Sequence, residues 1–172
     1  MNELGKENHR GKRFALIVMG IYLLFLCWLI LFKLADSVEK IPSMRAVNLI
    51  PFYYDQLAHS SFHLKEVLYN VLAFIPAGFF FTAFGKKKLV SGIAVCALLS
   101  LVFESLQWIF ALGASDITDL ITNTLGGALG AGTYFGLGKL SKGRQVRIVT
   151  VIGAVLETGF LVLFLVLMIA NS

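Results

Sequence analysis

The stretch ASDITDLITNTLGGALGAG, Ala114–Gly132, has the length and the apolar second half of a membrane-spanning helix. Its first half, however, carries Asp116, Asp119 and Asn123. An acid at the centre of a membrane helix costs about 2.5–3.5 kcal/mol on insertion scales, so such side chains normally face protein or water. The stretch therefore predicts a helix within a membrane bundle, with polar groups at one end and glycines at the other.

The composition of the whole chain agrees with a membrane protein. The 172 residues have a mean hydropathy of +0.81, with 58% hydrophobic and 15% charged residues, outside the range of soluble globular proteins. Backbone groups must be paired inside lipid, so apolar runs of about 20 residues indicate helices. Four such runs are Phe14–Leu34, Val67–Phe84, Leu89–Ala111 and Val149–Ala170, with Ile117–Leu137 as a weaker fifth. We expect an all-α, polytopic transmembrane bundle of about five spans.

The basic residues predict how the bundle is oriented. With five spans, eleven of the fifteen fall on one side: Lys6, Arg10, Lys12, Arg13, Lys86, Lys87, Lys88, Lys139, Lys142, Arg144 and Arg147. The other side receives Lys33, Lys40, Arg45 and Lys65. Loops on the cytoplasmic side carry the excess of Lys and Arg, so we expect a cytoplasmic N-terminus and an external C-terminus. The net charge of +5 then needs no nucleic-acid partner.

The predicted organisation is a basic cytoplasmic N-terminus, residues 1–13, followed by one membrane domain, residues 14–172. The first apolar run is longer than that of a signal peptide, so it is interpreted as a retained helix. An external segment, Ala35–Glu66, contains the apolar stretch AVNLIPFYYD, which favours an interfacial or re-entrant position. We expect Leu112–Ser115 to be a short external turn and Gly138–Arg147 an internal loop.

Polar residues share one face on each of three predicted helices, because they recur at helical spacing. These residues are Glu66 and Asn70 on the second helix, Ser100, Glu104 and Gln107 on the third, and Asp116, Asp119 and Asn123 on the fourth. The alternating topology places all three faces in the outer half of the membrane. Four carboxylates at one level need protons, a cation or basic side chains. The local candidates are Arg45, Lys65, His59 and His63, and Arg45 is the proposed charge partner.

Simpler roles compete with a functional site. Asp116 fits the N-cap of the fourth helix, with Asp119 at its third position, and the amides fit interhelical hydrogen bonds. Paired carboxylates also suit general acid and base catalysis, and oxygen ligands suit a hard cation. The histidine pair at spacing i, i+4 suits zinc less well than an interfacial role. We expect no metal and no cofactor, and Cys27 and Cys96 lie in apolar runs as small hydrophobic residues.

Two further features bear on packing. The glycines of the fourth helix, Gly126, Gly130, Gly132 and Gly136, form two small-xxx-small spacings, which suit either internal packing or a homo-oligomer. Glu157, near the centre of the fifth helix, is predicted to be protonated and hydrogen-bonded to a neighbouring helix, or to mark an oligomer interface.

Four ordered motifs resemble the VanZ-like family, which is named for a teicoplanin-resistance protein. They are NLIPF at Asn48–Phe52, YNVLAFIPAGFFF at Tyr69–Phe81, ESLQ at Glu104–Gln107 and DITDLITNTLGGALG at Asp116–Gly130. The core motif region spans residues 47–130. The resemblance implies a bacterial membrane protein without an established biochemical activity. Its shared polar positions here are Asn48, Asn70, Glu104, Gln107, Asp116, Asp119 and Asn123.

Many relatives carry an Arg shortly before the first Asp of the fourth motif. This chain has Gly113–Ser115 there, so a cation would have to come from Arg45 or a histidine.

The sequence leads to three hypotheses about function. In the first, the protein is not an enzyme; its outer-leaflet site binds a membrane lipid, a lipid-linked cell-wall precursor or a glycopeptide antibiotic, and lowers antibiotic susceptibility. In the second, a membrane enzyme modifies a lipid-linked substrate, with Glu104 and Asp119 as acid and base. The third is transport, which with five spans would need an oligomer.

Overall fold

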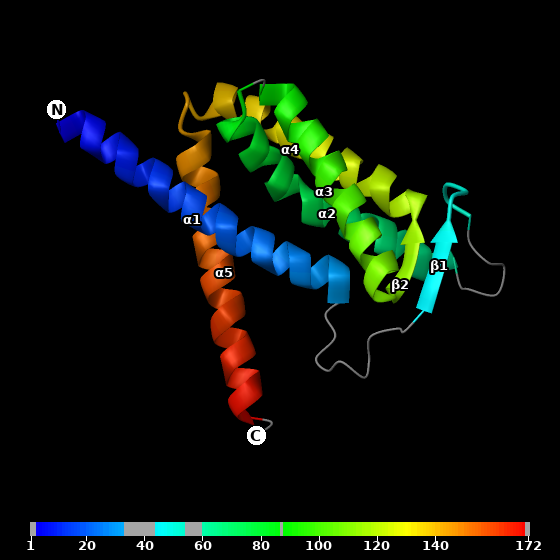
Figure 1. Ribbon diagram of the computed structural model, residues 1–172. Helices are drawn as coiled ribbons and strands as arrows, with labels where there is room; N and C mark the ends of the chain where they lie inside the picture. The colour runs from blue at the N-terminus through cyan, green and yellow to red at the C-terminus, as the bar shows by residue number, and fades with distance from the viewer. Residues whose placement is uncertain (1–2, 33–43, 54–59, 87, 171–172) are drawn as a thin grey trace. The chain divides into compact units, whose positions relative to one another are not determined.

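Five long helices make up most of the chain (Figure 1). The computed structural model describes residues 3–32, 44–53, 60–86 and 88–170. The helices are α1 (Glu3–Phe32), α2 (Ser60–Phe84), α3 (Lys88–Phe110), α4 (Ile117–Leu140) and α5 (Gln145–Ala170). Two short strands are β1 (Met44–Asn48) and β2 (Leu112–Asp116).

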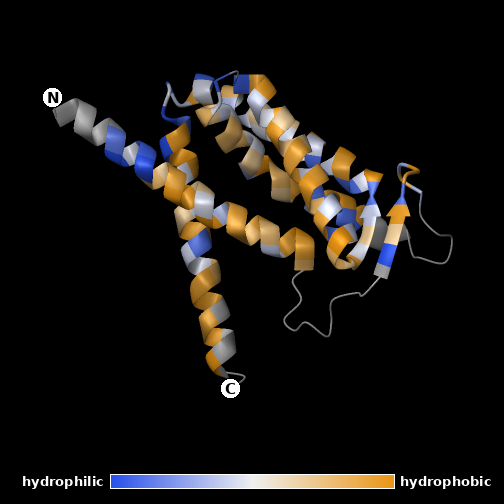
Figure 2. Cartoon of the chain, in the orientation of Figure 1, coloured by the Kyte–Doolittle hydropathy of each residue, from blue (hydrophilic) through white to orange (hydrophobic). Residues whose placement is uncertain are grey.

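The helical membrane fold predicted from the sequence is confirmed. Within the described part of the chain, four segments are long and apolar enough to cross a membrane: His9–Phe32, Leu64–Phe84, Lys88–Phe110 and Gln145–Leu163. The fifth long helix, α4, falls outside this group, as its polar first half and glycines predicted. Figure 2 shows hydrophobic residues predominating along the helices.

The chain divides into two compact units. Residues 1–25 and 137–172 form the first unit, in which α1 packs on α5. A side chain at Gly153 would meet Val18, and the rings of Phe25 and Phe160 lie 4.7 Å apart in an edge-on arrangement. From the first contact to the second, the chain advances by seven residues on α1 and by seven residues on α5. The two helices therefore run in the same direction in this unit. Glu157 lies four residues after Gly153 and three before Phe160, so it is on the same face of α5, the face that contacts α1.

The second unit, residues 26–136, has α2 and α4 in backbone contact. A Cβ atom at Gly126 would collide with the Val71 carbonyl, and one at Gly130 would collide with the Ile75 carbonyl. The first small-xxx-small spacing therefore serves packing inside this unit. Gly132 and Gly136 face the other way, because a Cβ atom at either position would have no neighbour within 4 Å.

The two strands correct the prediction that Leu112–Ser115 is only a turn. β2 pairs with β1 in parallel, with Met44 opposite Leu112 and Asn48 opposite Asp116. Parallel strands need a long crossover connection, and α2 and α3 supply most of it. The external segment is also shorter than predicted, since α2 begins at Ser60 rather than after Glu66. The internal loop is shorter as well, since α4 continues to Leu140 and α5 begins at Gln145.

Candidate functional site

Asp116 connects three elements at one end of the second unit. Its Oδ1 accepts the backbone N–H of Thr118 at 2.7 Å, so Asp116 caps the N-terminus of α4. Its Oδ2 accepts the side-chain amide of Asn48 at 3.0 Å, and its own N–H donates to Oε2 of Glu104 at 2.8 Å. The capping role predicted for Asp116 is confirmed, and the cap also joins β1 to α3.

The strand register explains why Asn48 reaches Asp116. The two residues are partners at the last position of the parallel pair, and their side chains meet beyond it. Glu104, which is 8% exposed, is also within reach of Asp116, because β2 follows α3 directly in the chain. Ser115 donates its hydroxyl to the Glu104 carbonyl at 2.7 Å, which ties β2 to the last two turns of α3.

A second pair joins α2 to the first turn of α4. The Asn70 side-chain amide donates to Oδ1 of Asp119 at 2.7 Å. Asp119 lies at the third position of α4, where a carboxylate interacts favourably with the positive end of the helix dipole. Both side chains are half-buried, so Asp119 is accessible from outside the unit. The Asn48–Asp116 pair and the Asn70–Asp119 pair flank the same helix end.

Two amides continue the polar face of α3 into the interior. Asn123 donates to the Ser100 hydroxyl at 2.9 Å, and Gln107 donates to the Ile30 carbonyl in the last turn of α1 at 3.0 Å. Both amides are buried, at 0% and 1% exposure. Their carbonyl oxygens have no hydrogen-bond partner among the described residues. Both amides are thus held by their donor side, through one bond each to α1 and α3.

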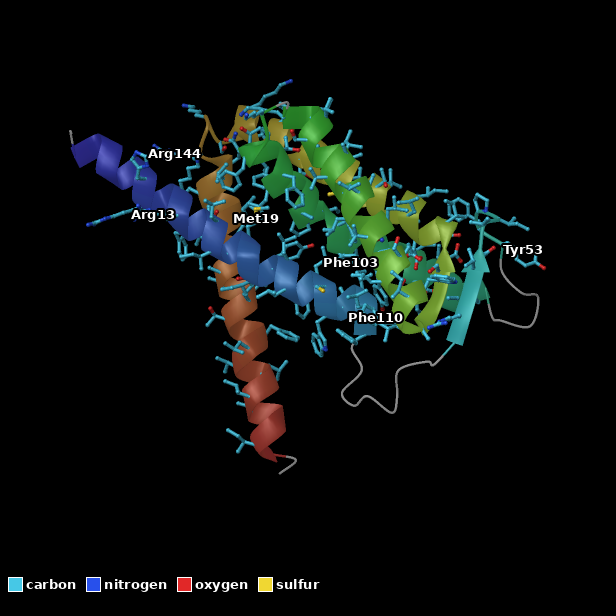
Figure 3. All side chains as sticks on the ribbon, in the orientation of Figure 1. Arg13, Met19, Tyr53, Phe103, Phe110 and Arg144 are labelled. Atoms are coloured by element: carbon cyan, nitrogen blue, oxygen red, sulfur yellow. The ribbon has the colours of Figure 1, made fainter. Side chains whose placement is uncertain are left out.

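The NLIPF motif forms a turn beyond β1. Oδ1 of Asn48 accepts the Ile50 N–H at 3.1 Å, and the Ile50 carbonyl accepts the Tyr53 N–H at 3.2 Å. Phe52, whose φ is 55°, donates its N–H to the Thr118 hydroxyl at 3.0 Å. The turn is therefore attached to the N-terminus of α4 through both side-chain and backbone bonds. Figure 3 shows Tyr53 beyond the end of β1.

Sequence reasoning did not single out Thr118 or Ser115. Thr118 is buried and its hydroxyl accepts the Phe52 N–H of the turn, while the Ser115 hydroxyl donates to the Glu104 carbonyl of α3. Their hydroxyls lie next to the two acids of the ASDITD segment, and small hydroxyl residues near a helix N-cap are the signal that could have identified them.

Arg45 occupies a different place from the one predicted. It donates to the Ile109 carbonyl at 3.2 Å, and its guanidinium lies 6.0 Å from the centre of the Trp108 ring. A cation is favourable at the negative end of a helix, and α3 ends at Phe110. Among the described residues its contacts are thus with the end of α3 and not with a carboxylate. His59 lies outside the described residues, as does the side chain of His63.

The predicted site residues therefore fall into three groups. One network holds Asn48, Asp116 and Glu104, one pair holds Asn70 and Asp119, and the deeper amides Gln107 and Asn123 follow the same face of α3 and α4. Within the described ranges, no three His, Cys, Asp or Glu side chains are grouped as metal ligands would be. Both oxygens of Asp116 accept bonds within the protein. Asp119 is half-buried and accepts the Asn70 amide.

Comparison with known proteins identifies the family. The VanZ/LLP1 family model matches residues 19–139. Protein VanZ of Enterococcus faecium is 39% identical over 127 residues, which cover 72% of this chain and 75% of the relative. The chain belongs to the VanZ family. No solved structure matches it.

The VanZ match includes every residue of the predicted site, from Arg45 to Asn123, and it ends within α4. The resemblance predicted from the four motifs is confirmed. In this VanZ-family chain three of the motifs meet at Asp116 of the DITD segment: its carboxylate accepts the Asn48 amide of NLIPF, and its N–H donates to Glu104 of ESLQ.

Proposed function

We propose that this VanZ-family protein acts at the outer leaflet of the bacterial plasma membrane and lowers susceptibility to glycopeptide or lipoglycopeptide antibiotics. It would do so by binding a lipid, a lipid-linked cell-wall precursor or the drug. The observation that carries the proposal is the convergence of Asn48, Asp116 and Glu104 beside the Asn70–Asp119 pair at one helix end. The family resemblance supplies the link to antibiotic susceptibility.

The distribution of charge supports placing this site outside. Basic residues gather in the first part of α1, around the connection from α2 to α3, and around the connection from α4 to α5, and the cytoplasmic side of membrane proteins carries such an excess. The opposite helix ends, where the polar network lies, would then face outward, with the N-terminus inside and the C-terminus outside. Lipid-linked precursors and glycopeptides are encountered on that side of the membrane.

The network is suited to binding because most of its polar groups are already oriented. Amide donors from β1 and α2 hold the carboxylates of Asp116, at the end of β2, and Asp119, in α4, and the Asp116 backbone holds Glu104. A ligand would therefore meet fixed acceptors rather than mobile side chains, which reduces the entropy lost on binding. Asp119, half-buried at the rim, is the residue on which we expect ligand binding to depend most.

The test is an antibiotic-susceptibility measurement in a deletion strain that is complemented with variants. Asp119→Asn keeps the size of the side chain and one oxygen that can accept the Asn70 amide, but it removes the charge and replaces the second acceptor oxygen with an NH2 group. We expect it to restore teicoplanin susceptibility to the level of the deletion strain, at normal membrane abundance. Glu157→Gln is the matched control, since it removes a carboxylate from α5, in the other unit. Equal protection by Asp119→Asn and the unmodified protein would refute the proposal.

The same strains distinguish binding from catalysis. Mass analysis of their envelope lipids and wall precursors would show a modified species that depends on Glu104 and Asp119 if the protein were an enzyme. Identical profiles together with an Asp119-dependent susceptibility would support binding.

A further inference from the structure

β2 runs back alongside α3 instead of away from it. The chain reverses just after the end of α3, where Ala111 has a left-handed φ of 55° and donates its N–H to the Trp108 carbonyl. Further along β2, Ser115 donates its hydroxyl to the Glu104 carbonyl, and the N–H of Asp116 donates to the Glu104 carboxylate. Figure 1 shows the β2 arrow beside the last turns of α3. The end of β2 therefore lies at the level of Glu104.

β1 follows the same course, because it pairs with β2 in parallel. Near the start of β1, Arg45 donates to the Ile109 carbonyl in the last turn of α3. At the end of β1, Asn48 donates to the carboxylate of Asp116. The NLIPF turn continues from Asn48, so it begins at the level of Glu104 and not at the level of the helix end.

The level of Glu104 lies inside the membrane. α3 has 23 residues and is long and apolar enough to span, so it is about 34 Å long beside a hydrocarbon core of about 30 Å. Glu104 precedes the last residue of α3 by six positions, or about 9 Å along the helix axis. On α2, Asn70 likewise follows the first residue of the Leu64–Phe84 span by six positions. Both polar pairs of the site are thus several ångströms inside the hydrocarbon core.

α4 gives an independent measure of this depth. It runs antiparallel to α3, with the Asp116–Glu104 bond just before its first residue and the Lys88–Tyr134 bond near its other end. The two bonds are 16 positions apart on α3, or about 24 Å, whereas the whole of α3 is about 34 Å long. α4 therefore begins below the outer end of α3, and the strand pair occupies the remaining depth.

The surface that the turn presents at this depth is apolar. Leu49 is 73% exposed and Tyr53 is 60% exposed, and the side chains of Ile50 and Phe52 are exposed as well. Leu101, about one helical turn deeper on α3, is also exposed. Exposed apolar side chains on a membrane-spanning helix face lipid, and an exposed apolar patch beside them marks a membrane contact.

The backbone of the turn is suited to an apolar environment. Irregular backbone is tolerated at membrane depth only where its polar groups have partners. Pro51 has no N–H, and the N–H groups of Ile50, Phe52 and Tyr53 are all bonded within the protein. The turn can therefore enter the acyl chains without leaving these donors unpaired.

We propose that the NLIPF turn is a re-entrant element that inserts into the outer leaflet, where its apolar side chains contact lipid acyl chains below the headgroups. The partner of this surface is the bilayer itself. The turn and the strand pair hold the Asn48–Asp116 bond and the start of α4 inside the membrane and not above it. Only the name of the leaflet rests on the function proposed above.

The depth of a single tryptophan in a bilayer tests the position of the turn. The reporter is Leu49→Trp in a background of Trp28→Phe and Trp108→Phe, which makes it the single tryptophan. Native Trp108, in a Trp28→Phe variant, marks the end of α3, and Leu101→Trp in the reporter background marks a lipid-facing position below Glu104. Each protein is placed in phosphatidylcholine bilayers whose acyl chains carry bromine either near the headgroup or near the chain end, and quenching is measured.

The reporter Leu49→Trp should lie about 6 Å or more deeper than Trp108, because Glu104 is four positions further into the membrane along α3. Its ratio of deep to shallow quenching should therefore be closer to that of Leu101→Trp than to that of Trp108. Iodide ions in the water should quench Leu49→Trp less than Trp108. Tyr53→Trp is a second reporter that should give the same result, since the Tyr53 bond within the turn is made by its backbone.

A quenching ratio for Leu49→Trp and Tyr53→Trp that equals that of Trp108, or that is shallower, would overturn the inference. Iodide quenching of both reporters as strong as that of Trp108 would also overturn it. These outcomes are separate from the susceptibility test. If the reporters are shallow while Asp119→Asn abolishes protection, the depth inference fails and the proposed function stands. If the reporters are deep while Asp119→Asn protects fully, the proposed function fails and the re-entrant turn stands.

Discussion

Replacing Gly130 with alanine should separate α4 from α2, because the two backbones touch at this glycine. An alanine Cβ atom there would lie 2.7 Å from the Phe79 nitrogen and 3.0 Å from the Gly78 Cα, and closer still to the Ile75 carbonyl oxygen. Favourable heavy-atom contacts lie at about 3.5–4.0 Å, so one helix must move by about 1 Å. Every obstructing atom belongs to the backbone, so no side-chain rotation can relieve the collision.

The expected cost follows from two opposing contributions. Overpacking of this kind destabilises by about 1–3 kcal/mol, and occasionally more. Alanine is favoured over glycine within a helix by about 1 kcal/mol. Gly132→Ala should show this gain by itself, because the new methyl group meets nothing within 4 Å. The propensity gain is common to both variants, so Gly130→Ala should be about 1–3 kcal/mol less stable than Gly132→Ala. At this chain length the difference corresponds to about 2–12 °C in thermal midpoint.

Thermal unfolding of the two purified variants in the same detergent measures this difference. The two substitutions are the same chemically and lie two positions apart on one helix, so propensity and synthesis effects are matched. The displacement should also weaken the Asn70–Asp119 bond, which joins the same pair of helices, so Gly130→Ala should lose protection against teicoplanin. Equal thermal midpoints for Gly130→Ala and Gly132→Ala would refute the packing argument.

Three further substitutions test single contacts by thermal unfolding. Asp116→Ala removes the cap of α4 and the Asn48 bond, and it should lower the free energy of unfolding by about 1–2 kcal/mol. Asp116→Asn is an equally good cap and should recover most of this loss. Equal losses in the two variants would contradict the capping role. Gln107→Leu leaves the Ile30 carbonyl without its donor and should cost about 1 kcal/mol, and an unchanged midpoint would show that water replaces the amide. Tyr134→Phe removes the 2.8 Å bond from Lys88 and should cost about 0.5–1.5 kcal/mol without altering antibiotic susceptibility, so a changed susceptibility would argue against separate roles.

The helices and their polar faces could be predicted because both depend on local patterns. Apolar runs of about the length of a membrane identify helices, and spacing of three or four residues puts Ser100, Glu104 and Gln107 on one face. The cap at Asp116 was also predictable, since residue type and position at a helix start largely determine it. These features need no knowledge of which helices are neighbours.

The partners in the site could not be predicted in the same way. Asn48 meets Asp116 because two five-residue strands pair in a particular register, and strands this short carry little periodic signal. The spacing of the α4 glycines likewise does not tell that Gly126 and Gly130 meet α2 while Gly132 and Gly136 do not. Arg45 was assigned to a carboxylate from charge alone, whereas the register brings it to the end of α3.

The parallel strand pair has a consequence for the order in which the protein assembles. Asn48 and Asp116 are 68 positions apart in the chain, and two membrane-crossing helices are synthesised between them. Closing a loop of this length costs more entropy than joining neighbouring helices, and β1 can find its partner only after α3 and β2 have emerged. Until then Glu104 has no Asp116 N–H to bind, and the acids of α4 enter the membrane without their amide partner from β1. The strand pair therefore cannot form before α3 and β2 have been made, and a chain that inserts all its helices but misplaces β1 would lack the Asn48–Asp116 bond.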